Sequence, residues 1–286
     1  MISEGTIRIA VIVPCYDDGA TLPDTIASIE EPEQVELVVV DDGSRDPQTC
    51  ELLAQLERDG VRVVRHERNR GLVAARMTGV EATRAPYLFP LDSDDCAVPG
   101  ALSRMADALD GRPDAAVCYG DYLEFGRKDL VRAVPEAIDP YRIAYTNEYP
   151  AAALFRREVL ERLGGWNGEL GLPSYEDWHL WMKLAEQGRV GVHLGHGQLT
   201  YRRRLHPEGA ARLLDLGKEQ HVDLYRRLRT SHADLFERLP EHRRRSDLSV
   251  PRKLLYPIVY GGRRRLPFER RVKRLLDRIG VWTLRR

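Results

Sequence analysis

Residues 36–44 read ELVVVDDGS, a short apolar run with three consecutive valines that ends in an acidic turn. Similar runs lie at 7–13, 61–65 and 87–91, and segments with apolar residues at helical spacing lie between them, at 21–29, 47–58 and 71–83. Near-continuous apolar strands that alternate with helices are typical of a parallel sheet covered on both faces. The sequence therefore predicts a doubly wound α/β fold, with a mostly parallel sheet flanked by helices.

Three of the predicted strands run directly into acidic turns, namely Pro14-Cys15-Tyr16-Asp17-Asp18, Asp41-Asp42-Gly43-Ser44 and Asp92-Ser93-Asp94-Asp95. Ligands of such sheets bind outside the carboxyl ends of the strands, so we expect these turns to meet at one edge. Two carboxylates one residue apart, Asp92 and Asp94, suit a hard divalent cation such as Mg²⁺ or Mn²⁺. The same residue types also favour helix caps and plain polar turns, so each turn alone leaves both interpretations open.

Two further segments carry polar residues at predicted helix starts. In NRGLVAAR, residues 69–76, a glycine opens a helix and would let backbone N–H groups approach an anion, although Arg76 could equally be an exposed helix residue. The P-loop Gly-Lys-Ser/Thr is missing, and no strand-linked Gly-x-Gly-x-x-Gly is present, which argues against an NAD enzyme.

Glu176 and Asp177 begin a predicted helix over 174–187, where acids suit the helix dipole and Ser174 could cap it. Facing a cleft, such a carboxylate would instead take a proton from an attacking hydroxyl.

The chain resembles the family two glycosyltransferases over residues 7–210. The resemblance rests on six segments in this order: VIVPCYDDGATL, VVVDDGS, NRGLVAAR, LDSDD, FRREVLERLGGW and YEDWHLWMKL. The resemblance implies a GT-A fold and an inverting enzyme that moves one sugar from a nucleotide sugar, with a UDP-sugar as the first choice. The acceptor would be a hydroxyl of a saccharide or of a lipid-linked molecule. The Gln-x-x-Arg-Trp motif of processive members is absent, which favours single sugar addition.

The resemblance also implies roles for single residues. The nucleoside would contact Pro14, Tyr16, Asp18, Asp42 and Arg76, and Asp92 and Ser93 would lie near the ribose. Asp94, with Asp92 and His206, would hold Mn²⁺ or Mg²⁺. Asp177, beside Glu176, would be the catalytic base. Arg202, Arg203 and Arg204 would help to bind the leaving diphosphate, because guanidinium groups bind phosphate well. Asp17 stands where the family usually has asparagine, and the arginine cluster before His206 is longer than usual.

The charge is divided unevenly along the chain. Residues 241–286 carry 15 Lys/Arg against 4 Asp/Glu, which leaves 29 against 40 in the rest. We therefore expect a catalytic domain over 1–240, with a nucleotide-sugar half to about 120 and an acceptor half over 121–240, and a basic amphipathic tail over 241–286. A helix over 268–284 would suit an anionic membrane surface, or it would pack on the acidic body. Nucleic-acid binding is disfavoured, because the motifs upstream already explain the body.

The remaining features bear on location and on rival functions. Four cysteines without metal-ligand spacing predict reduced thiols, and the lack of a leader peptide or long apolar segment predicts a cytoplasmic protein, peripheral at the inner membrane face if the tail binds lipid. A nucleotidyltransferase would carry a Gly-rich basic loop after the first strand, whereas this loop is acidic. A non-catalytic nucleotide-sugar-binding scaffold could lose Asp94 and Asp177 freely, and both are present.

Overall fold

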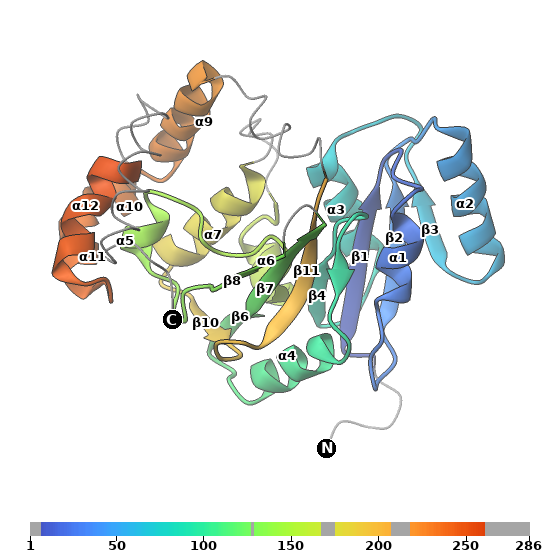
Figure 1. Cartoon of the computed structure of the whole chain (residues 1–286), viewed down its shortest axis with the longest axis horizontal. Helices are drawn as coiled ribbons and strands as arrows, with labels where there is room; N and C mark the ends of the chain where they lie inside the picture. Colours follow the sequence, from blue (N-terminus) through green and yellow to red (C-terminus); the bar gives the residue numbers. More distant parts are fainter. Residues whose placement is uncertain (1–6, 127–128, 167–174, 207–217, 261–286) are drawn as a thin grey trace.

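The structure is a computed structural model, and it describes residues 7–126, 129–166, 175–206 and 218–260. In these residues two sheets form (Figure 1). The larger one has the strand order β10 (Val190–His193), β6 (Ala115–Tyr119), β9 (Leu154–Arg156), β4 (Tyr87–Pro90), β1 (Ile9–Cys15), β2 (Glu36–Asp41) and β3 (Arg62–Arg65). The smaller one has the order β5 (Cys96–Ala97), β11 (Leu199–Leu205), β7 (Asp121–Gly126) and β8 (Leu130–Arg132).

The larger sheet is parallel except for β9, which pairs antiparallel with both β4 and β6. Along β1 the side chains alternate, so that Ala10 and Ile12 enter one buried cluster while Ile9, Val11 and Val13 enter another. A strand buried on both faces reads as a continuous apolar run, as the sequence does here. The predicted α/β fold with a mostly parallel sheet is confirmed.

Helices cover both faces of this sheet. One face is covered by α3 (Leu72–Ala82), α6 (Arg157–Arg162) and α7 (Glu176–Glu186), and the other by α1 (Leu22–Ala27), α2 (Pro47–Arg58) and α4 (Ala101–Asp110). Helix α3 lies very close to β1, since a Cβ on Gly79 would come within 2.2 Å of Ile12 Cγ2. Only glycine permits this approach, which fixes the start of α3 relative to the end of β1.

The remaining helices form one group at the side of the molecule opposite α2 (Figure 1). They are α5 (Pro140–Ile143), α9 (Lys218–Ser231), α10 (Ala233–Glu237), α11 (Leu239–Arg245) and α12 (Val250–Tyr260). Tyr141 of α5 donates its hydroxyl hydrogen to the carbonyl of Lys253 (2.6 Å), and Tyr256 is buried against Tyr141 and Tyr145. The described part of the basic tail, to residue 260, therefore packs on the body. The helix predicted over 268–284 lies outside the described residues.

Local contacts set the extent of two later strands. Strand β9 contains only Leu154–Arg156, because Pro150 cannot donate to a ladder and its carbonyl accepts from Trp181 Nε1 (2.9 Å). The Arg-rich segment from residue 201 lies in β11 as far as Leu205. The cysteines are all free thiols, with Cys15, Cys96 and Cys118 buried and Cys50 exposed.

In the part of the chain that the structure describes, no helix combines the length and the apolar character that crossing a bilayer requires.

Candidate active site

Strands β4, β1 and β2 are adjacent and parallel, so the three acidic turns that follow them lie at one edge of the sheet. Hydrogen bonds join the turns to one another. Ser93 Oγ donates to Asp18 Oδ2 (2.9 Å), and the backbone N–H of Asp17 donates to Ser44 Oγ (3.1 Å). The structure therefore brings these turns together at the carboxyl edge of the sheet, as the sequence predicts.

The turn after β4 concentrates negative charge. Asp92, Asp94 and Asp95 each offer a carboxylate oxygen, and these oxygens lie within 4.8 Å of one another. Burial, together with the charge of Asp92, raises the pKa of Asp94 above its usual range. Asp95 is buried and accepts the backbone N–H of Arg204 (2.8 Å), so it also holds β11 against the turn. Carboxylates packed this closely form a site that a divalent cation would stabilise.

His206 follows β11 directly and reaches the same turn. Its Nε2 lies 3.0 Å from Asp94 Oδ2. The strand pairing of β11 with β5 carries the histidine there, since Arg202 pairs with Cys96, just after the acidic turn. The structure thus brings together Asp92, Asp94 and His206, the three residues that the resemblance gives to the metal.

The candidate base lies at the first turn of α7. Glu176 is buried, with 8% of its side chain exposed, whereas 21% of the Asp177 side chain reaches solvent. Burial and the neighbouring Asp177 raise the pKa of Glu176 to about 7. Burial also raises the pKa of Asp177, while the charge of Arg76 opposes that effect. Asp177 is therefore the more accessible of the two carboxylates and the one that accepts a hydrogen bond from Arg76 (2.8 Å).

Arg76 lies between these two groups of acids. It is 1% exposed, and it donates from Nη1 to Asp177 Oδ1 and from Nη2 to Asp92 Oδ1, both at 2.8 Å. The resemblance gives Arg76 a place near the nucleotide, and the structure joins it to the carboxylate that the resemblance puts near the ribose.

Asp42 is deeply buried, and its carboxylate already has three partners. Oδ1 lies 2.6 Å from His66 Nδ1 and accepts the N–H of Arg70 (2.8 Å), while Oδ2 accepts the N–H of Gly71 (2.7 Å). Each carboxylate oxygen has two acceptor positions, so one position on Oδ2 is left for a base. Gly43 makes the turn possible: its φ is +76°, and a Cβ would come within 2.5 Å of the Arg68 carbonyl carbon.

The other predicted nucleoside contacts lie along the same edge. Pro14 is buried inside β1, in register with Val40 of β2. Tyr16 is exposed, and Asp18 is half-buried beneath the hydroxyl of Ser93. An exposed aromatic ring beside a carboxylate-rich edge offers a surface on which a nucleobase can stack.

The three arginines of β11 point to different sides. The guanidinium carbons of Arg202 and Arg204 lie over the ring of Phe125, at 4.5 and 4.8 Å from its centre. Arg203 points the other way; burial raises the pKa values of Asp95 and Asp177, and the charge of Arg203 opposes that rise in both. Of the three, Arg203 is the one whose charge acts on both the acidic turn and the candidate base.

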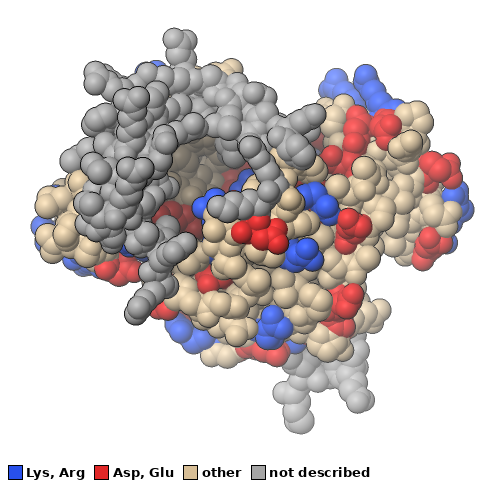
Figure 2. Space-filling model, viewed as in Figure 1, with Lys and Arg blue, Asp and Glu red and all other residues tan. Residues whose placement is uncertain are grey.

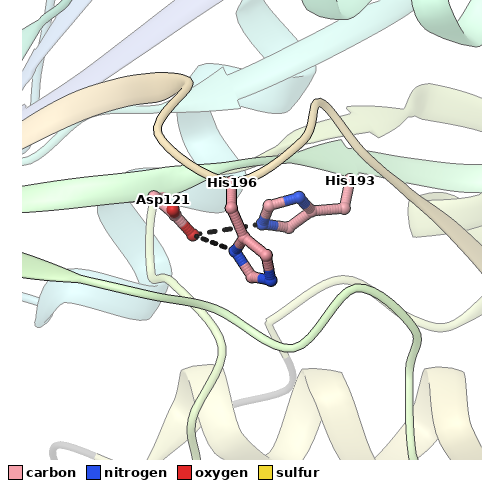
Figure 3. A group of neighbouring side chains, drawn as sticks. All are labelled: Asp121, His193 and His196. Atoms are coloured by element: carbon pink, nitrogen blue, oxygen red, sulfur yellow. Dashed lines mark hydrogen bonds and ion pairs between the residues drawn. The ribbon is translucent and has the colours of Figure 1, made fainter. Parts of the chain in front are cut away.

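A second group of metal-capable side chains lies at the opposite end of β7 and β11 from His206, and Figure 3 shows Asp121, His193 and His196 together. Gly195 donates its N–H to His193 Nδ1 (3.0 Å), so Nε2 must carry the ring hydrogen, which points to Asp121 Oδ1 at 3.2 Å. A neutral imidazole in this tautomer has no lone pair on Nε2. We therefore interpret this group as a hydrogen-bonded connection between β7 and β10.

Two residues of the site were given no role from the sequence. Asp95 directly follows the Asp-Ser-Asp triplet, so the run of acids was a signal for it. His66 stands in no motif, and nothing in the sequence indicates its contact with Asp42.

Residues 10–164 match the model of the family "Glycosyl transferase family 2". This match covers more than half of the 286 residues, and the chain belongs to that family of glycosyltransferases.

The chain spans different shares of the length of two relatives. An uncharacterized glycosyltransferase of Haemophilus influenzae is 25% identical over 203 residues, which are 68% of this chain and 67% of that protein. An undecaprenyl-phosphate 4-deoxy-4-formamido-L-arabinose transferase of Pseudomonas aeruginosa is 36% identical over 106 residues, 35% of this chain and 31% of that protein.

Solved structures share the architecture. S. aureus TarS in complex with UDP-GlcNAc has a TM-score of 0.61 and 19% identity, over 96% of this chain and 78% of that one. The mannosyltransferase PcManGT from Pyrobaculum calidifontis, in complex with GDP-Man and Mn²⁺, has a TM-score of 0.59 and 16% identity, over 98% and 82%. At these identities the likeness shows the fold, and the predicted GT-A fold is confirmed.

Proposed function

We propose that this glycosyltransferase moves a single sugar from a nucleoside-diphosphate sugar to a hydroxyl acceptor, with inversion at the anomeric carbon. The observation that carries the proposal is the convergence at one sheet edge of the acidic turn at 92–95, His206, and the carboxylates of α7. Membership in a glycosyltransferase family favours sugar transfer over the rival nucleotidyl transfer. Arg76 links Asp177 to Asp92, which lies beside Asp94, and this grouping of carboxylates favours a catalyst over a scaffold.

A UDP-sugar is the donor that we favour. One solved structure of this fold is a complex with UDP-GlcNAc and another is a complex with GDP-Man, so the fold accommodates more than one nucleotide. The exposed ring of Tyr16 and the last acceptor position of Asp42 would meet the base. UDP, dTDP and GDP sugars remain the three donor classes to compare.

The acidic turn fits a divalent cation. Its carboxylate oxygens are close together, and burial and neighbouring negative charges raise the pKa values of Asp94 and Asp95. Asp94, Asp92 and His206 would hold Mn²⁺ or Mg²⁺, which when bound neutralises charge on the leaving diphosphate. These ligands are mostly oxygen donors, as both ions prefer.

The chain's own residues would divide the remaining work. Asp177 accepts the proton of the attacking hydroxyl, since it is the accessible carboxylate of α7 and retains a cationic partner. Glu176, with its pKa near 7, is partly protonated at neutral pH and leaves the negative charge to Asp177. Arg203 would bind a diphosphate oxygen through its guanidinium group.

Replacing Arg203 by alanine is expected to raise the KM for the donor about tenfold or more, because a charge-assisted hydrogen bond to phosphate is lost. The matched control is Arg202→Ala on the same strand, whose guanidinium covers Phe125 instead of facing the acids. We expect its KM to stay within about twofold of the wild-type value, as is usual for exposed sites. Steady-state kinetics with varied donor measures both, and equal effects of the two substitutions would contradict the assignment.

A lipid-linked acceptor and an anionic membrane surface belong to the same proposal. The name of the P. aeruginosa relative includes undecaprenyl-phosphate, a lipid carrier. Docking of α12 on α5 leaves Val250 and Leu254 exposed, and Lys253 of the same helix donates from Nζ to the carbonyl of Arg244 in α11 (3.5 Å). Over the described residues of the face in Figure 2, acidic and basic side chains are mixed, which does not resemble a nucleic-acid surface. Binding to anionic but not to zwitterionic vesicles is the result that the membrane part requires.

The experiment that tests the proposal is a thermal-unfolding panel of UDP-, dTDP- and GDP-sugars, each with and without Mn²⁺. A ligand at a hundredfold excess over its Kd should add about 2.7 kcal/mol to the free energy of unfolding. Stabilisation by one nucleotide class, dependent on the metal, is the expected outcome.

A further inference from the structure

Arg76 is buried in α3 and joins two parts of the site that come from distant parts of the chain. Asp92 follows β4, whereas Asp177 lies at the start of α7, 101 residues from Arg76. Each of these carboxylates accepts one hydrogen bond of 2.8 Å from the guanidinium, and Glu176 Oε1 lies 3.6 Å from Nη1. One cation therefore holds the candidate base next to the acidic turn.

The shape of the guanidinium makes this connection rigid. Its nitrogens lie in one plane at fixed separations, so two carboxylates bound to Nη1 and Nη2 are held at a defined distance and angle. The ring of Trp166 packs on the group, with its centre 5.6 Å from the guanidinium carbon. A lysine has one ammonium nitrogen and cannot reproduce the fork.

Stability alone does not account for this arrangement. Taking charges out of water is costly, and a buried ion network often contributes little net stability. The Nε hydrogen of Arg76 has no partner among the described residues, so the group is not even fully satisfied. A cation placed in this way, at the boundary between two functional groups, is better explained by what it positions.

We propose that Arg76 is a positioning residue that fixes the base Asp177 relative to the donor, with Asp92 as its anchor. The inference rests on the proposed role of Asp177. Arg76 occupies Oδ1 of Asp177 and leaves Oδ2 to accept the proton of the acceptor hydroxyl. Its charge also opposes the effect of burial on Asp177 and so favours the ionised form that a base needs.

The test is a double-mutant cycle of Arg76→Lys and Asp177→Asn. The quantity measured in each variant is the turnover number for hydrolysis of the nucleotide sugar that gives the largest thermal shift. In the wild-type background, Arg76→Lys should lower kcat about 10²-fold, as expected when a catalytic group is misplaced by about 1 Å. In the Asp177→Asn background, the same substitution should cause no further loss, because the residue through which it acts is gone.

The second readout is the affinity for Mn²⁺ alone, measured from the electron paramagnetic resonance signal of the free ion. This affinity should change less than about threefold in Arg76→Lys, because the positive charge beside Asp92 is retained. The matched control is Arg142→Lys, a buried arginine of α5 that pairs with Glu148 at 2.8 Å. It should lower the melting temperature and leave kcat unchanged.

Two results would overturn the inference: an equal loss of kcat in both backgrounds, or a loss of Mn²⁺ affinity large enough to explain the fall in kcat. If Arg76→Lys fails to fold, Trp166→Phe is the substitute, because it displaces the guanidinium more gently. Trp166→Phe should lower kcat about threefold in the wild-type background and cause no further loss in the Asp177→Asn background. An Asp177→Asn enzyme with wild-type turnover would instead reject the proposed base, which is a different failure.

Discussion

Replacing Asp177 by asparagine is expected to lower the turnover number of sugar transfer by about 10²- to 10⁴-fold, the usual contribution of a general base. The amide keeps the shape of the side chain but cannot accept the proton of the attacking hydroxyl. Donor binding should be nearly unchanged, because Asp177 and Asp92 are bound to different nitrogens of Arg76, and the change leaves Asp92 and Asp94, the proposed donor-side residues, untouched. Release of nucleoside diphosphate measures turnover, and the KM for the donor measures binding.

The neighbouring carboxylate supplies the control for this experiment. Glu176→Gln removes a carboxyl group that is buried and has a pKa of about 7, so we expect a much smaller loss of turnover. Thermal unfolding of both variants checks that each still folds. A larger loss in Glu176→Gln than in Asp177→Asn would move the role of base to Glu176.

The second large effect is expected for Asp94→Asn. This change removes the charge of the proposed oxygen ligand and weakens the contact with His206 Nε2 at 3.0 Å, because an amide oxygen is a poorer acceptor than a carboxylate. We expect Mn²⁺ affinity to fall by more than the roughly 10- to 100-fold that changes in outer-shell partners of a metal cost, and turnover to fall with it. Calorimetric titration of Mn²⁺ in the presence of the nucleoside diphosphate measures the affinity.

An exposed aspartate far from the acidic turn provides the comparison. Asp114 pairs with Arg112 on the surface, and Asp114→Asn should leave both metal affinity and turnover unchanged. Asp94→Asn with normal Mn²⁺ affinity would mean that the metal, if the enzyme uses one, binds elsewhere.

The part of the larger sheet that contains β1 to β4, together with its functional edge, could be predicted because its signals are local. Each of the strands β1, β2 and β4 is a short apolar run followed directly by its acidic turn, and parallel pairing places the three turns side by side. The rule that ligands bind at the carboxyl ends of such strands then selects the edge. No long-range information was needed for this part of the fold.

The smaller sheet could not be predicted, because its pairing joins distant segments. Strand β11 pairs with β7 and with β5, about 80 and 105 residues earlier in the chain. Its sequence, LTYRRRL, has too many charges to read as a strand. The structure gives the physical reason that it is one, since Arg202 and Arg204 cover the ring of Phe125 with their guanidinium groups.

The interior of the site was also beyond sequence reasoning. The motifs indicate Arg76 and Asp177 separately, but only the placement of α3 and α7 on the same face of the sheet brings the two side chains to 2.8 Å. The same holds for His66, whose contact with Asp42 depends on the loop that follows β3. Side-chain partners between distant elements are decided by tertiary packing, which no local pattern encodes.

The most direct test of the central claim is the thermal-unfolding panel of nucleotide sugars, run in parallel on the wild-type protein and on Asp94→Asn. Our account predicts that one nucleotide class stabilises the wild-type protein, that the effect requires Mn²⁺ or Mg²⁺, and that Asp94→Asn removes the metal-dependent part. Absence of stabilisation by every donor with metal present, or an equal response of the two proteins, would contradict it.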